Sequence, residues 1–171
     1  MCERRTCAEM TDYDLLAAQA RALLSGETDF IANAGNFASF VYHELPQLNW
    51  VGFYFSDERG DLVLGPFNGR PACTRLAHGR GVCGAAFTQE ETVVVADVNA
   101  FGDHIVCDSA SKSEIVVPVR DDDGIYGVFD IDSPVTGRFT DADRRGIEGL
   151  VEAFLSETRN QRRATAVSPR P

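Results

Sequence analysis

The spacing of apolar residues changes twice along this chain, and the two changes limit the folds that it can adopt. Apolar residues recur at helical spacing over residues 12–24 and 29–45, and again in a closing segment that begins after Thr140. From Trp50 the period changes to two, as in the segment 50–55, which is typical of strands with one buried face, and further strands are expected as far as Asp132. Helices at both ends of the chain around a run of strands predict an α+β domain.

The middle of the chain divides into about six strands joined by turns. The Asp-Glu-Arg-Gly segment at 57–60 and the Asp-Asp-Asp-Gly segment at 121–124 are turn signals that favour antiparallel hairpins. Pro118 has no backbone donor and indicates an edge position or a bulge. We therefore expect an antiparallel sheet with helices on one face and loops on the other, built from strands at 50–55, 62–64, 74–77, 92–96, 115–120 and 125–132.

The length and net charge of the chain limit its number of domains and the kinds of partner that it can bind. The 171 residues fit one domain, which we expect over residues 12–163, with a flexible N-terminus at 1–11 and a disordered tail at 164–171. A formal net charge of −10 disfavours a nucleic-acid partner. The N-terminus lacks the apolar core of a signal peptide, and no segment approaches the ~20 apolar residues of a membrane span. These features predict a cytoplasmic protein that binds no membrane.

Five cysteines at irregular spacing are typical of free thiols in a reducing compartment. Three of them, Cys73, Cys83 and Cys107, lie in the central part of the chain. Cys83 follows a glycine-rich stretch and falls near the start of a short predicted helix, where a thiol pKa can be lowered. Cys107 falls in a long loop at 97–113, which also carries His104. Each cysteine taken alone could equally be a small buried apolar residue.

Three acidic residues accompany the central cysteines. Asp130 and Asp132 share one face of a predicted strand, about 7 Å apart, while Phe129 and Ile131 form the core face. Glu114 joins them if its side of the neighbouring strand faces the same cavity. Acids gathered beside a cavity raise one another's pKa and can hold a proton at neutral pH. The alternative is that all three acids simply face water.

An aromatic strand face offers a wall for such a cavity. Trp50 and Tyr54 point away from the core side of their strand, which carries Val51 and Phe53. A cavity with thiols and acids suits redox chemistry at sulfur. One thiolate attacks the sulfur, a second thiol takes over the oxidised product as a disulfide, and a protonated carboxylic acid supplies the proton that the leaving oxygen needs. The reduction of a sulfoxide needs these three functions.

Zinc is a competing interpretation, with Cys73, Cys83 and Cys107 as ligands together with His78 or His104. The cysteine spacings of ten and 24 residues, without a Cys-x-x-Cys hook, are unlike those of the usual structural zinc sites. We therefore expect neither a metal nor another cofactor.

Taken together, these residues resemble the GAF-domain enzymes known as free methionine-(R)-sulfoxide reductases. The resemblance covers the chain from about Leu15 to Leu155, and the three cysteines make it more specific than a likeness to GAF domains in general. The matching segments are Asn49-Trp50-Val51-Gly52-Phe53-Tyr54, Arg80-Gly81-Val82-Cys83-Gly84, His104-Ile105-Val106-Cys107-Asp108-Ser109, Ser113-Glu114-Ile115-Val116-Val117-Pro118 and Gly127-Val128-Phe129-Asp130-Ile131-Asp132-Ser133.

The resemblance implies a role for each central cysteine. Cys107 would attack the sulfoxide sulfur and become a sulfenic acid. Cys73 would resolve that acid as a disulfide that thioredoxin reduces, and Cys83 would be an auxiliary thiol able to form alternative disulfides. Glu114 would also help to protonate the sulfoxide oxygen. The residues implied to hold the substrate, free methionine-(R)-sulfoxide, are Trp50, Tyr54, Asp97, Glu114, Asp130 and Asp132.

The resemblance further implies a single GAF domain, a homodimer, and a small pocket that accepts the free amino acid but not a peptide. A second interpretation from a different class stays open, in which the chain is a non-catalytic GAF sensor that binds a small ligand. Binding without loss of thiols would distinguish the sensor from the enzyme.

Overall fold

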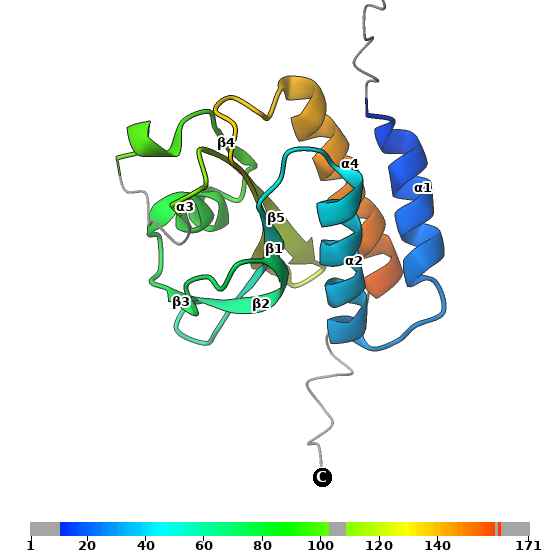
Figure 1. Ribbon diagram of the computed structural model, residues 1–171. Helices are drawn as coiled ribbons and strands as arrows, with labels where there is room; N and C mark the ends of the chain where they lie inside the picture. The colour runs from blue at the N-terminus through cyan, green and yellow to red at the C-terminus, as the bar shows by residue number, and fades with distance from the viewer. Residues whose placement is uncertain (1–10, 103–108, 160, 162–171) are drawn as a thin grey trace, which may run out of the picture.

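The computed structural model describes residues 11–102, 109–159 and 161, and shows a six-stranded antiparallel sheet with helices on both faces (Figure 1). The strand order is β3-β2-β1-β6-β5-β4, so β1 and β6 lie at the centre. The predicted α+β class is confirmed. The strands are β1 (Trp50–Ser56), β2 (Leu62–Gly69), β3 (Arg75–Leu76), β4 (Val93–Val95), β5 (Ser113–Asp121) and β6 (Gly124–Ser133).

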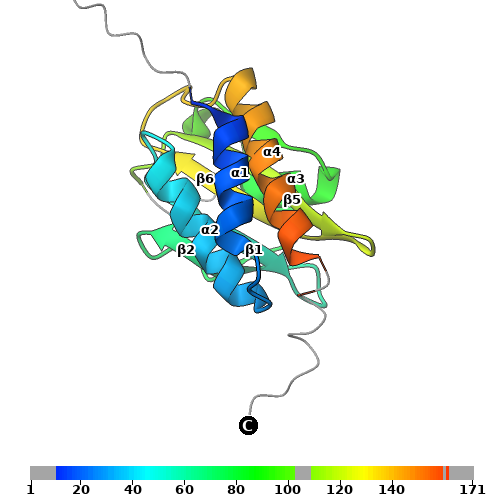
Figure 2. The same ribbon diagram turned by 90° about the vertical axis from the view of Figure 1, so that its right-hand side faces the viewer.

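Three helices, α1 (Tyr13–Leu24), α2 (Phe30–Glu44) and α4 (Asp141–Thr158), cover one face of the sheet (Figure 2). Their apolar stripes pack on the side of β1 that carries Val51 and Phe53, in a core rich in aromatic rings. None of the helices in the described part of the chain is both long and apolar enough to cross a membrane.

The helix starts follow from side-chain caps. The Asp12 carboxylate accepts a hydrogen bond from the amide of Leu15 and so caps α1. Thr140 caps α4 and forms a complete capping box with Asp143. These caps satisfy backbone donors that would otherwise lack partners at the helix starts.

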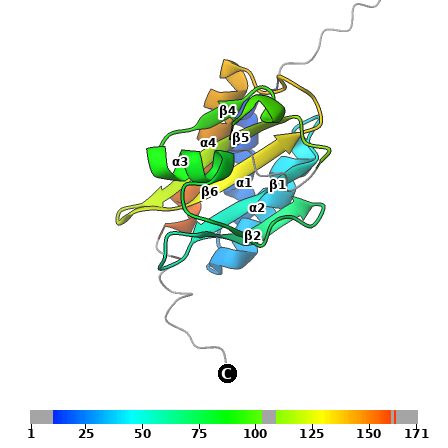
Figure 3. The ribbon, with the colours of Figure 1, turned by 90° about the vertical axis from the view of Figure 1, so that its left-hand side faces the viewer.

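The opposite face of the sheet carries the short helix α3 (Gly81–Gln89) and the connecting loops (Figure 3). A second, smaller apolar cluster lies here, where α3 packs on β1, β5 and β6 through Trp50, Tyr54, Val82, Val116 and Val128. The sheet therefore has one buried layer on each face, and alternate residues of β1, β5 and β6 point toward the face that carries α3.

One strand, β2, differs strongly from its predicted extent, and one predicted irregularity, at Pro118, can be located. β2 continues to Gly69, well beyond the predicted 62–64, because it pairs with β1 along its length through a register shift between Gly52 and Tyr54. Pro118 lies in β5 just past Val116, where the pairing with β4 ends, and a register shift with β6 follows at Val119. The missing donor of Pro118 is therefore tolerated, as predicted for an edge or a bulge.

Candidate active site

A pocket opens on the α3 side of the sheet, between the central strands, α3 and the loop that follows β2. The register of the strands sets its floor: Trp50 pairs with Asp132, and Asp132 in turn pairs with Glu114. The described residues that line it are Trp50, Tyr54, Pro71, Ala72, Leu76, Arg80, Gly81, Val82, Cys83, Ser111, Glu114, Asp130 and Asp132.

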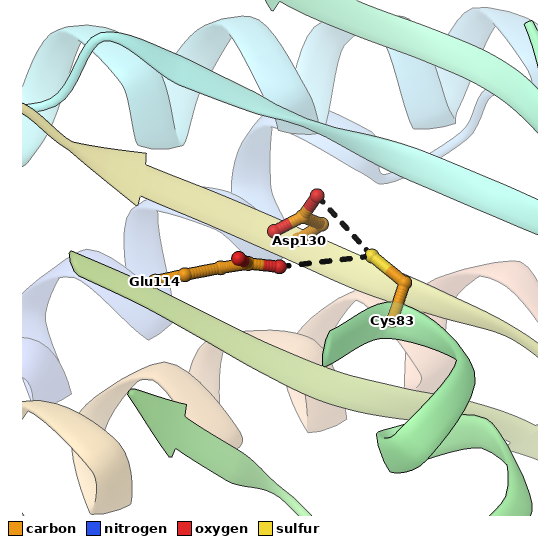
Figure 4. A group of neighbouring side chains, drawn as sticks. All are labelled: Cys83, Glu114 and Asp130. Carbon is orange, nitrogen blue, oxygen red and sulfur yellow. Dashed lines mark hydrogen bonds between the residues drawn. The ribbon is translucent and has the colours of Figure 1, made fainter. Parts of the chain in front are cut away.

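Two acids and a thiol that line the pocket lie side by side (Figure 4). The thiol of Cys83, from α3, lies 3.3 Å from Oδ2 of Asp130 on β6 and 3.9 Å from Oε1 of Glu114 on β5. Glu114 and Asp130 are each 6% exposed and Cys83 is 4% exposed. The strand parity inferred from the sequence therefore brings Glu114 and Asp130 to one face, and both acids are buried.

Burial and mutual repulsion keep protons on these groups. Burial raises the pKa of Asp130 to about 7. Burial and the charges of Asp130 and Asp132 raise the pKa of Glu114 well above its usual range. A hydrogen bond between the carboxyl groups of Glu114 and Asp130 acts in opposite directions on the two, favouring the proton on Glu114. Near neutral pH this pair therefore offers one protonated acid beside one carboxylate.

The electrostatics of Cys83 differ from the sequence prediction. A helix start can lower a thiol pKa, but burial and the neighbouring carboxyl groups raise the pKa of Cys83 well above its usual value. The prediction of a lowered pKa is therefore wrong, because desolvation and two facing acids outweigh the first turn of a nine-residue helix.

Aromatic rings form the wall of the pocket. The indole of Trp50 stacks on Tyr54, with ring centroids 5.9 Å apart, and on Phe67, at 5.5 Å. Gly52 makes this possible, since a side chain there would collide with the Trp50 ring. Trp50 and Tyr54 are each 2% exposed, so the wall is rigid and apolar.

The same two aromatic residues hold the loop that carries Cys73. Nε1 of Trp50 donates a hydrogen bond of 3.1 Å to the carbonyl of Arg70, and the Tyr54 hydroxyl donates one of 3.0 Å to the carbonyl of Cys73. Cys73 is disulfide-bonded, whereas Cys83 is a free thiol. The partner of Cys73 is not among the described residues.

Among the described residues, two members of the alternative zinc set are engaged in other interactions. Cys73 is in a disulfide, and His78 lies against the β1–β2 turn, where its Nδ1 is 3.1 Å from the carbonyl of Gly60. Within the described ranges, Cys83, Glu114 and Asp130 do lie close enough to hold a cation, with their donor atoms inside 4.8 Å of one another. Two carboxyl groups and one thiol without a histidine are an unusual zinc set.

One predicted site residue lies outside the pocket, and others fall outside the described residues. Asp97 does not line the pocket, because its carboxylate caps the single turn at Val98–Ala100 by accepting hydrogen bonds from Asn99. Cys107 and His104 lie outside the described residues, as do the predicted tail and most of the predicted flexible N-terminus.

Arg80 and Ser111 line the pocket but were not identified from the sequence. Arg80 stands directly before α3, and the glycine-rich His78–Gly81 stretch was the available signal. Another arginine, Arg75, forms ion pairs with Asp57 and Asp61 at the β1–β2 turn.

Comparisons with known proteins identify the family of this chain. The GAF domain family model matches residues 13–155. Protein YtsP of Bacillus subtilis is 50% identical over 89% of this chain and 94% of its own length. The free methionine-R-sulfoxide reductase of Escherichia coli is 48% identical over 81% of this chain and 84% of its own length.

Among solved structures, the free methionine-R-sulfoxide reductase from Neisseria meningitidis in complex with its substrate superimposes with a TM-score of 0.84. The two chains are 40% identical, and the match covers 89% of this chain and 91% of the other. The chain described here therefore belongs to the GAF-domain family of free methionine-R-sulfoxide reductases.

Proposed function

We propose that this chain reduces free methionine-(R)-sulfoxide to methionine, with thioredoxin as the final reductant. The observation that carries the proposal is the buried pair of Glu114 and Asp130, which retains a proton near neutral pH beside an aromatic wall. A disulfide cysteine, Cys73, belongs to the loop at the edge of the same pocket. A protonated acid, an apolar pocket wall and a cysteine that can form a disulfide are the features that sulfoxide reduction needs.

Cys107 is the proposed nucleophile. Its thiolate attacks the sulfur of the substrate, the sulfur–oxygen bond breaks, and the oxygen ends on Cys107 as a sulfenic acid while methionine leaves. The sulfoxide oxygen needs a proton in this step, and the protonated carboxyl group of Glu114 donates it. The sulfur of the substrate is reduced by two electrons and that of Cys107 is oxidised by two.

Cys73 is the proposed resolving thiol. Its attack on the sulfenic acid forms a disulfide and releases water, and a dithiol such as thioredoxin then reduces that disulfide by exchange. The disulfide already present at Cys73 supports this role. Because Cys83 is a free thiol, the remaining candidates for the partner are Cys2, Cys7 and Cys107, and we assign Cys107.

The remaining lining residues suit a free amino acid. The carboxylates of Asp130 and Asp132 attract an ammonium group, and the guanidinium of Arg80 in the same lining is suited to a carboxylate. The indole of Trp50 offers an apolar face to the methyl group on sulfur. A cytoplasmic homodimer that acts in defence against oxidation completes the proposal.

A coupled assay tests the activity. NADPH loss is followed in the presence of thioredoxin, thioredoxin reductase and each diastereomer of free methionine sulfoxide. We expect turnover with the R form, little with the S form, and none with an R-sulfoxide inside a peptide. Failure with both free diastereomers would overturn the proposal. Saturable binding of the sulfoxide without loss of thiols would then indicate a sensor.

A further inference from the structure

We propose that Cys83 is a positioning residue whose single thiol hydrogen is donated to Asp130, with Glu114 as a second, more distant acceptor, and that this donation stabilises the state in which the pair carries one negative charge. The inference deepens the proposed function, on which it rests. It gives Cys83 a task other than that of an auxiliary redox thiol. The step that Cys83 serves is the placement of the proton on the acid pair before the sulfoxide is attacked.

The position of Cys83 is set by rigid elements. It is the third residue of α3, and the next residue, Gly84, packs so tightly on the backbone of Gly79 that a side chain there would collide with it. The buried start of α3 therefore has little freedom to move. The resulting contacts, 3.3 Å to Asp130 and 3.9 Å to Glu114, lie within the range of hydrogen bonds made by sulfur.

The surroundings of Cys83 favour a thiol over a thiolate. Asp130 and Asp132 face it from β6, Glu114 faces it from β5, and Tyr54 approaches from β1. Arg80, which precedes the same helix, lines the pocket as well. Burial and the negative groups together raise the pKa of the Cys83 thiol well above its usual value, which keeps the proton on sulfur.

A protonated thiol can act on the neighbouring carboxyl groups only as a hydrogen-bond donor. It donates its hydrogen, so it favours the ionised form of the carboxyl group that accepts it. The contact with Cys83 lowers the pKa of Asp130, against the upward effect of burial, and acts likewise on Glu114. Without Cys83, the carboxyl group of Asp130 would stay protonated to a higher pH.

A thiol held in this way is also a slow nucleophile. Attack on a sulfenic acid or a disulfide requires the thiolate, and its fraction falls as the thiol pKa rises. In this structure Cys83 is a free thiol although Cys73 is disulfide-bonded. The disulfide of Cys73 therefore does not include Cys83.

The first test measures the titration of a carboxyl group directly and does not depend on enzyme turnover. Carboxyl groups are labelled with ¹³C in aspartate, and the titration of Asp130 is followed by NMR in the parent chain, Cys83→Ala and Cys83→Ser. The Asp130→Asn variant assigns the signal. We expect the midpoint of Asp130 to rise by roughly half to one pH unit in Cys83→Ala, since a weak hydrogen bond to a charged group has this effect.

The serine variant is the matched control, because its hydroxyl can donate in place of the thiol. We expect its midpoint to lie between those of the parent chain and Cys83→Ala, or to equal that of the parent. An unchanged midpoint in Cys83→Ala, or equal shifts in both variants, would overturn the proposal. A purely packing role would not make the size of the midpoint shift depend on whether the substituted side chain can donate a hydrogen bond.

The second test connects the titration to the reaction. The pH profile of kcat/KM for the sulfoxide should have its acid limb moved upward in Cys83→Ala and restored toward the parent in Cys83→Ser. If the parent chain shows no turnover, the proposed function fails while the NMR titration still decides the role of Cys83. If turnover is present, but neither the acid limb of the pH profile nor the titration midpoint of Asp130 moves in Cys83→Ala, only the inference about Cys83 fails.

Discussion

The hydroxyl of Tyr54 donates a hydrogen bond of 3.0 Å to the backbone carbonyl of Cys73. The contact joins a ring at the wall of the pocket to the loop that carries the disulfide cysteine. Tyr54 is 2% exposed, so water cannot readily replace the hydrogen bond if it is lost. The chemistry at sulfur and the shape of the pocket are thus connected through one buried hydroxyl.

Tyr54→Phe should therefore lower the free energy of unfolding by about 1–2 kcal/mol, because it leaves the Cys73 carbonyl without its donor. Urea denaturation measures this change. Thioredoxin-driven turnover should also slow, since the loop that presents Cys73 loses one of its anchors. Tyr42→Phe is the control, because Tyr42 lies on α2 and is only partly buried. Equal losses in the two variants would contradict the role of the Tyr54 hydroxyl.

The contact between α1 and α4 gives a second prediction, on stability alone. A side chain at Gly146 would overlap the ring of Tyr13, whose hydroxyl is fixed by a 2.7 Å hydrogen bond to Asp143. Gly149 lies in the same helix, and a methyl group added to it would meet no other atom within 4 Å. We expect Gly146→Ala to destabilise the fold by roughly 1–3 kcal/mol, as overpacking does.

The matched control for this helix is Gly149→Ala. Alanine has the higher helix propensity, so this variant should be more stable than the parent by about 0.5–1 kcal/mol. Thermal unfolding of the two variants side by side measures the contrast. Stabilisation in both would show that the Tyr13 ring moves aside at no cost.

The cysteine assignments give a third prediction, which depends on the proposed function. Cys107→Ser should abolish even the single, stoichiometric release of methionine, because the nucleophile is gone. Cys73→Ser should retain that one release and lose thioredoxin-driven turnover, because the sulfenic acid is no longer resolved. Rapid-quench measurement of methionine with one equivalent of sulfoxide separates the two. The opposite pattern would exchange the roles of the two cysteines.

Much of the fold could be predicted from the sequence because the signals were local. The change from helical to alternating spacing at Trp50 indicated the sheet and its two faces, and strand parity put Asp130 and Asp132 on one face and made Glu114 a candidate for the same side. The extent of β2 could not be predicted in the same way. Its second half contains Gly65, Pro66 and Gly69, and it is a strand because β1 pairs with it.

The pKa values and the lining of the site depend on tertiary contacts, which the spacing of residues along the sequence does not reveal. Cys83 lies near a helix start, as predicted, but the direction of its pKa follows from acids 31 and 47 residues away in sequence. Asp97 was expected in the site as an acidic residue. Its carboxylate instead accepts a hydrogen bond from the backbone of Asn99 and caps the turn at Val98–Ala100. Arg80 lines the pocket only because α3 packs against the sheet.

The acid pair gives a last prediction, on the pH dependence of stability. The pKa of Asp130 is raised to about 7 in the folded chain, while the unfolded chain has the ordinary aspartate value. The folded state then binds more protons than the unfolded state between these two values. Stability from this group is complete below the unfolded pKa and is lost as the pH rises through about 7.

Asp130→Asn removes this dependence, because the amide stays neutral at every pH. Relative to the parent, the variant should gain roughly 1–3 kcal/mol of unfolding free energy between pH 5 and pH 8. Urea denaturation at the two pH values measures the gain, with Asp122→Asn in the exposed β5–β6 turn as the control that should show none. A difference between Asp130→Asn and the parent that stays constant with pH would mean that the buried carboxyl group already ionises near its ordinary pKa.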